Sequence, residues 1–123
     1  MPSQDIEGFA QLLIHQVRDA AIHSLDGELH PGSNSPTAKR WRNALDESLP
    51  VVIIPDCVDH ALFYLLRAID EGGIPLSFSS NSGKKADLVA EGFGELSGWL
   101  VCTGGWRENY SKERYADDNA DLA

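Results

Sequence analysis

The chain has little cysteine: Cys57 and Cys102 are the two in 123 residues. They stand forty-five positions apart, without CxxC spacing and without a second pair. This pattern excludes a disulfide framework and predicts free thiols in a reducing compartment, so we expect a cytoplasmic protein. A single disulfide is the alternative, if the two segments meet.

Basic residues are scarce too. Ten Lys and Arg stand against nineteen Asp and Glu, which gives a formal net charge of −9. This charge repels phosphate backbones and anionic headgroups over a Debye length, so we expect neither nucleic acid nor a membrane as a partner. It suits a basic protein, a cationic ligand or solubility alone equally well.

Long apolar runs and standard catalytic motifs are missing as well. No run approaches the roughly 18 residues of a membrane-spanning helix, and the first seven residues lack the basic residues of a secretory signal. Gly83-Lys84-Lys85 lacks the rest of a P-loop, and Ser97 comes one place too late for G-x-S-x-G. HExxH, EF-hand and zinc-finger spacings do not occur, so we expect no cofactor.

What the sequence does contain is helical periodicity. Apolar residues from Asp5 to about Leu25 recur on one stripe, which predicts a long amphipathic helix. Ser35-Pro36 predicts the capped start of a second helix that runs to about Glu47. Its expected inward face is Ala38, Trp41 and Leu45, and its expected solvent face is Lys39, Arg40 and Arg42.

The middle of the chain combines an apolar run with a third helix. Val51 to Ile54 is β-branched and followed by Pro55, which predicts a buried extended segment. Asp56 is then expected to cap a helix that ends at Gly72-Gly73. Its expected inward residues are Val58, Ala61, Leu62, Leu65, Leu66 and Ile69.

The last third predicts a hairpin between about Leu76 and Val89, turning at Asn81-Ser82-Gly83. A glycine-interrupted helix follows Gly92, then a last amphipathic turn from Trp106 to Tyr115 and a frayed acidic tail from about residue 116. The predicted fold is α+β and predominantly helical, with helices around a single core and one β-hairpin. We expect residues 1–123 to form a single domain.

A candidate binding site lies on the polar face of the third predicted helix. Asp56, Asp59, His60 and Arg67 share this face, and Phe63 stands among them. An aromatic ring amid ionisable groups can be the floor of a cleft with acid, base or cation-binding chemistry. In the alternative interpretation, the helix is covered on both sides and the two acids only cap it.

Two further patterns have weaker chemical interpretations. Cys57 and His60 resemble a Cys/His nucleophile pair, but the neighbouring acids raise a thiol's pKa, so an inert, half-buried thiol is the favoured interpretation. His15, Asp19 and His23 are spaced four residues apart, which places the two imidazoles about 12 Å apart along one helix. A three-ligand zinc site on one straight helix is therefore strained, although a two-residue half-site is feasible. We predict a solvated face and no structural metal.

A candidate interface lies near the C-terminus, where Trp106, Arg107, Tyr110 and Arg114 fall on one side of the last predicted helix. Tryptophan, tyrosine and arginine are enriched among the residues that dominate binding energies. Docking of this helix onto the chain's own core is the favoured alternative.

Three stretches carry a resemblance: residues 38–45, residues 54–70, and Gly94-Glu95-Leu96-Ser97-Gly98-Trp99. Together they resemble a family of small uncharacterised bacterial proteins over most of the chain. The resemblance implies a bacterial cytoplasmic origin and supplies no activity, cofactor or catalytic residue.

These observations predict a non-catalytic acidic domain that binds or oligomerises, with itself or a basic protein as partner. The alternative is a small hydrolase-like or ligand-binding enzyme that uses Asp56, Asp59 and His60. A purely structural acidic domain is the third hypothesis.

Overall fold

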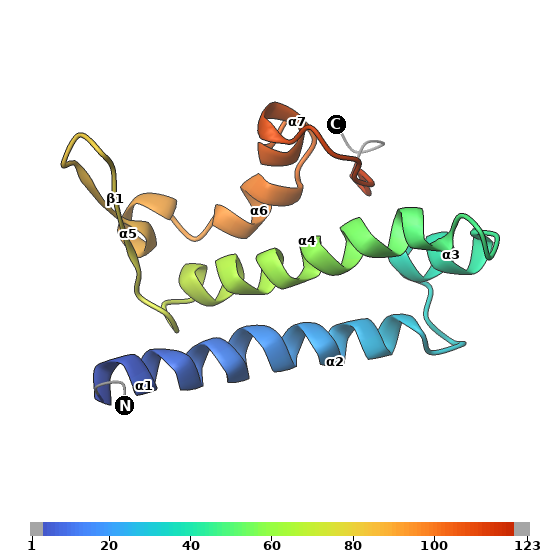
Figure 1. Ribbon diagram of the computed structural model, residues 1–123, viewed down its shortest axis with the longest axis horizontal. Coiled ribbons are helices and arrows are strands. Elements are labelled where there is room, and N and C mark those ends of the chain that lie inside the picture. Colours follow the sequence, from blue (N-terminus) through green and yellow to red (C-terminus); the bar gives the residue numbers. More distant parts are fainter. Residues whose placement is uncertain (1–3, 120–123) are drawn as a thin grey trace.

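Helix α4 (Leu49–Asp70) lies in the middle of the molecule, with other helices on two sides (Figure 1). The computed structural model describes residues 4–119. Along one side of α4 runs a continuous helical rod made of α1 (Gln4–Leu12), the π-helical turn η1 (Leu13–Arg18) and α2 (Asp19–Glu28). Along the other side lie α6 (Leu96–Val101) and α7 (Trp106–Tyr110). The predicted fold class, α+β and mostly helical, is confirmed.

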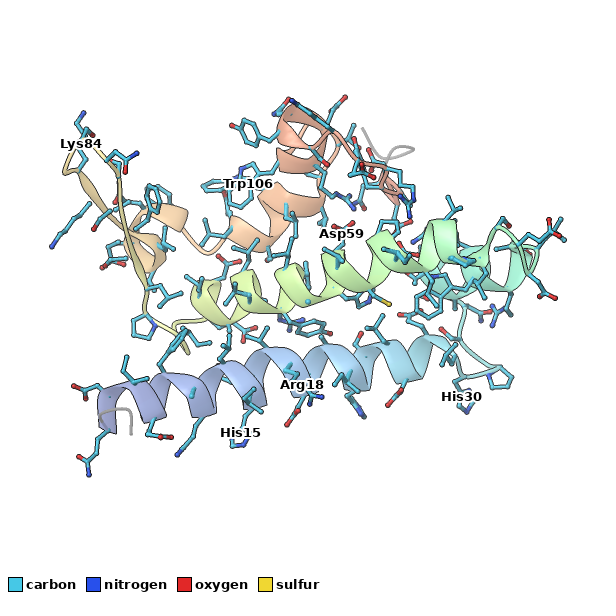
Figure 2. All side chains as sticks on the ribbon, viewed as in Figure 1. His15, Arg18, His30, Asp59, Lys84 and Trp106 are labelled. Carbon is cyan, nitrogen blue, oxygen red and sulfur yellow. The ribbon has the colours of Figure 1, made fainter. Side chains whose placement is uncertain are left out.

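The core forms where the rod, α4 and α6 meet. Its buried members are Val17 of η1, Ala68 and Ile69 of α4, Ile74, and Leu96 of α6. The apolar stripe predicted for the first helix therefore does face α4. Its polar face points the other way, and His15 lies on that outer side (Figure 2).

Helix α3 (Pro36–Asn43) begins as predicted, because the Ser35 hydroxyl accepts a hydrogen bond from the Ala38 amide at 2.9 Å. It ends earlier than expected. Leu45 lies beyond it and is exposed rather than inward. The expectation for Arg40 is also wrong: its guanidinium contacts the buried Asp56.

The extended segment predicted at residues 51–54 is wrong, because these residues form the first turns of α4. Pro50 occupies the first turn, where a helix needs no amide donor. Pro55 lies inside the helix and Asp56 is a buried mid-helix residue, not a cap. Pro55 has no amide hydrogen to donate to the Val51 carbonyl, four residues earlier. Arg114 donates a hydrogen bond to that carbonyl instead. The predicted end at Gly72 is confirmed.

Helix α4 is also long and apolar enough to cross a membrane, by length and composition alone. The expectation that no segment approaches that length is therefore wrong. Its most apolar 18-residue window has a mean hydropathy of 1.6, and only 6% of that window is buried. Core helices of soluble proteins pass the same test of length and composition. Most residues of α4 are half-buried against neighbouring helices, while Val51, Ile54, Val58 and Leu62 are exposed.

The hairpin is confirmed. Strands β1 (Ser77–Ser79) and β2 (Lys85–Asp87) pair antiparallel, with Phe78 opposite Ala86. Asp87 then caps α5 (Leu88–Gly92) by accepting hydrogen bonds from the amides of Val89 and Ala90, so the second strand is shorter than predicted.

The last two helices form a tight corner. A Cβ atom at Gly105 would lie 2.3 Å from the Trp99 carbonyl oxygen, so this close approach of α7 to α6 requires glycine. Helix α7 ends at Tyr110, five residues before the predicted end. Beyond it, Asp117 and Asp118 accept hydrogen bonds from Thr103 and Arg40. Fraying of the tail from about residue 116 stays a prediction. The end of the predicted tail, 120–123, lies outside the described residues.

Candidate binding groove

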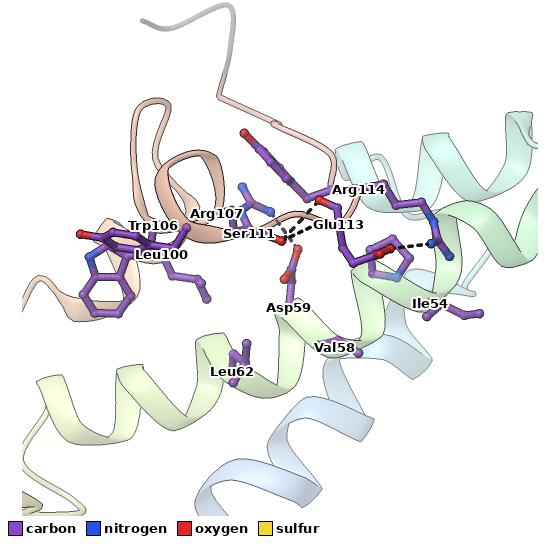
Figure 3. A pocket seen from close by; sticks show the side chains of 13 residues that line it. Ile54, Val58, Asp59, Leu62, Leu100, Trp106, Arg107, Ser111, Glu113 and Arg114 are labelled. Atoms are coloured by element: carbon purple, nitrogen blue, oxygen red, sulfur yellow. Dashed lines mark hydrogen bonds and ion pairs between the residues drawn. The ribbon is translucent and has the colours of Figure 1, made fainter. Parts of the chain in front are cut away.

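A largely apolar groove of about 640 Å³ lies between α4, α6–α7 and residues 111–115 (Figure 3). Its floor is a stripe of α4 in which Ile54, Val58 and Leu62 recur every four residues. Leu100 and Trp106 form one wall, and Tyr110 stands at the edge with 77% of its surface exposed. The volume lies within the 300–1,000 Å³ or so of typical ligand pockets.

Arg107 fixes the roof of this groove onto α4. Its guanidinium donates to Asp59 at 2.9 Å and to the Val101 carbonyl at 3.0 Å, and it stacks 4.6 Å from the centre of the Tyr115 ring. Within residues 4–119, Arg107 Nε is the one buried polar side-chain atom that lacks a hydrogen-bond partner. Because both ends of the Arg107–Asp59 pair are mostly buried, the pair sets the spacing between α7 and α4.

Asp70 fixes the wall of the groove from the far end of α4. Its carboxylate accepts hydrogen bonds from the Leu96 amide, the Ser97 amide and the Ser97 hydroxyl, at 2.8–2.9 Å. Asp70 is thus a cap for α6 supplied by a different helix. This contact joins two separate helices, so no local pattern in the sequence indicates it.

A second, polar cavity of about 290 Å³ lies behind Arg107, which borders both cavities. The structure brings four of the predicted binding residues, Asp56, Asp59, His60 and Phe63, to this cavity. Arg67 is elsewhere: it is exposed and pairs with Glu71 at 2.9 Å, one helical turn along α4.

The acids of the polar cavity already have protein partners. Asp56 accepts a 2.7 Å bond from Arg40 and another from the Trp41 indole, and Asp59 accepts from Arg107. Burial lowers the pKa of Arg40, but its hydrogen bonds to Asp56 and Asp118 outweigh burial and raise that pKa above its ordinary value. These carboxylates hold α3 and α7 onto α4.

The other residues of this cavity give little further chemistry. His60 Nδ1 lies 3.0 Å from the Asp56 carbonyl oxygen, one turn back on the same helix. Burial raises the pKa of the neighbouring Cys57 thiol, and the charge of Asp56 raises it further, which favours the protonated, unreactive form. Across residues 4–119, no three His, Cys, Asp or Glu side chains are grouped to bind a metal ion.

All four residues of the predicted interface line the apolar groove: Trp106, Arg107, Tyr110 and Arg114. Arg107 is turned inward and pairs with Asp59, whereas Arg114 is more exposed and pairs with Glu113 at 3.3 Å. The predicted inward face of the third helix was partly wrong, because Val58 and Leu62 are exposed on the groove floor. Their apolar four-residue spacing was visible in the sequence, but it does not reveal that no other segment covers them.

Comparison with known proteins adds no relative: no protein-family model, curated protein or solved structure matches this chain.

Proposed function

We propose that this chain is a non-catalytic binding domain whose groove between α4 and α6–α7 receives an apolar helix of a protein partner. The observation that carries the proposal is the exposed stripe Ile54–Val58–Leu62 at the floor of a groove with fixed walls. Contiguous exposed apolar surface rimmed by polar groups marks interaction sites. A four-residue apolar repeat is the pattern by which one helix packs against another.

The rim supports the same function. Tyr110, Trp106 and Arg114 border the groove, and these residue types dominate binding energies at interfaces. Arg107 and Asp70 hold the walls through partly buried contacts, so little order has to be gained on binding.

The enzyme hypothesis has less support. A catalytic carboxylate or base needs a free atom within hydrogen-bond reach of a substrate. Here both oxygens of Asp56 and one of Asp59 are bonded to Arg40, Trp41 and Arg107. The bonded oxygens of Asp56 and Asp59 therefore contribute to the packing of α3, α4 and α7.

The test is an NMR titration of the isotopically labelled chain with a model amphipathic peptide of zero net charge. Amide shifts should gather around residues 54–62 and 106–115. Leu62→Asp should abolish these shifts. Ile22→Asp is the control: Ile22 has nearly the same exposure as Leu62 (41% against 43%), but it lies on α2, outside the groove, so the shifts should remain. Shifts that map to the rod, or none at all, would contradict the proposal.

A further inference from the structure

We infer that the partner in the groove is a second copy of this chain, related by a two-fold axis that passes beside Val58. The inference deepens the proposed function and rests on it, since both require the groove to receive an apolar helix.

The first argument is surface area. The chain exposes 8570 Å². A folded monomer of its 13.4 kDa mass would expose roughly 6,500 Å². The excess of roughly 2,000 Å² belongs to the whole chain, including the rod and the hairpin as well as the groove. It is as large as the 1,000–2,500 Å² or so that each subunit of an obligate homodimer buries. A standard-size specific interface removes only about 800 Å² per partner.

The second argument is the symmetry of the groove floor. Ile54, Val58 and Leu62 lie on one i±4 ridge, with Val58 at its centre. A two-fold axis through the centre makes the contact self-complementary: Val58 meets its own counterpart, and Ile54 of each copy meets Leu62 of the other. Two such ridges interlock when helices cross at about −50°.

The third argument is charge. The groove is lined by Asp59, Glu113, Arg107 and Arg114, so its acids and bases balance and the net charge of −9 is carried by the rest of the chain. A basic partner would need an acidic face, which the groove does not offer. A neutral, apolar patch on an otherwise acidic protein fits a second copy of the same patch.

The direct test is sedimentation of the whole chain over a range of concentrations. Wild type should form dimers. Leu62→Asp should weaken dimerisation by at least about 30-fold, the loss expected for a dominant interface residue, with an unchanged helical spectrum. Ile22→Asp, the matched control, should dimerise as wild type does. A Leu62→Asp variant that still dimerises with wild-type affinity would overturn the inference.

The axis is tested by a cysteine at its centre. In a Cys57→Ser/Cys102→Ser background, mild oxidation should link Val58→Cys chains into dimers, because identical positions on an axis can bring their Cβ atoms to about 4 Å. Leu45→Cys is the control: Leu45 is more exposed than Val58 (78% against 54%) but lies outside the groove. Equal linking of both variants would exclude the axis.

Salt and lipid distinguish the other occupants. Added salt should strengthen the dimer, because it screens the repulsion between two acidic chains, whereas it would weaken a complex with a basic protein. Co-sedimentation of the chain with phosphatidylcholine vesicles, lost in Leu62→Asp, would assign the stripe to a membrane and overturn the inference. A wild type that stays monomeric but binds the model peptide would overturn the dimer and leave the proposed function intact. A wild type that neither dimerises nor binds the model peptide would overturn the dimer and the proposed function together.

Discussion

Arg114 donates a 2.7 Å hydrogen bond from its Nε to the carbonyl oxygen of Val51, the acceptor that Pro55 leaves without its helical donor. A proline inside a helix removes the amide that would bond to the residue four positions earlier. Arg114, sixty-three positions later in the chain, takes the place of that amide. The same contact fixes the edge of the groove, because Arg114 and Pro55 both line it.

A double-mutant cycle tests this replacement. Arg114→Ala should lower the free energy of unfolding by about 1 kcal/mol, less than for a buried charged donor because Arg114 is 45% exposed. In a Pro55→Ala background the restored amide serves Val51, so the same change should cost almost nothing. Urea melts of the four variants give the coupling. Tyr110→Ala is the control. Tyr110 lines the same groove but does not bond to Val51, so its replacement should show no coupling to position 55.

The Asp56 cluster gives a second stability prediction. Asp56→Ala leaves the Trp41 indole without its acceptor and removes two of the hydrogen bonds that Arg40 donates, in a site where Asp56 is 7% exposed. It should therefore cost about 3–5 kcal/mol. Asp56→Asn keeps one acceptor oxygen and should cost less. Thermal or urea unfolding measures both. A loss of less than about 1 kcal/mol for Asp56→Ala would show that water replaces these contacts and that the acid is not structural.

Asp70 gives a third stability prediction. Asp70→Ala removes the cap that α4 provides for α6 and should destabilise the chain by about 1–3 kcal/mol. Because α6 carries the groove wall, amide exchange of residues 96–101 should speed up more than that of the rod. Glu95→Ala is the control, since Glu95 occupies the N-cap position without a side-chain bond there. Uniform loss of protection across the chain would contradict this local role.

Local patterns predicted much of the fold. The rod, the Ser35 cap, the end of α4 at Gly72 and the hairpin each depend on periodicity or turn chemistry within a short stretch, and all are confirmed. The extended segment at residues 51–54 failed because β-branched composition and Pro55 favoured a strand locally. The compensation comes from Arg114, a contact that no local pattern contains.

The candidate sites divide in the same way. Helical spacing grouped Asp56, Asp59, His60 and Phe63, which line one cavity, but it wrongly added Arg67. It also grouped Trp106, Arg107 and Tyr110, whereas Arg114 lines the groove from beyond the end of α7. It did not predict that Arg40 and Arg107 neutralise the two acids, because those pairs join separate helices. Nor could it predict an open groove. Burial of Val58 and Leu62 depends on whether another segment covers them, which spacing alone does not determine.

The last prediction concerns the pH dependence of Cys57. Burial and the Asp56 charge raise its pKa in the folded chain, so the folded state keeps the thiol proton at pH values where the unfolded state begins to lose it. In a Cys102→Ser background, the rate of alkylation by iodoacetamide should therefore rise at a higher pH in buffer than in urea. Stability should fall as pH rises from the unfolded thiol's pKa through the folded one, since the unfolded chain then binds fewer protons. Asp56→Asn removes the charge but not the burial, so it should move the alkylation profile part of the way back. A folded profile that coincides with the urea profile would refute the shift and reopen the Cys57–His60 pair as a nucleophile.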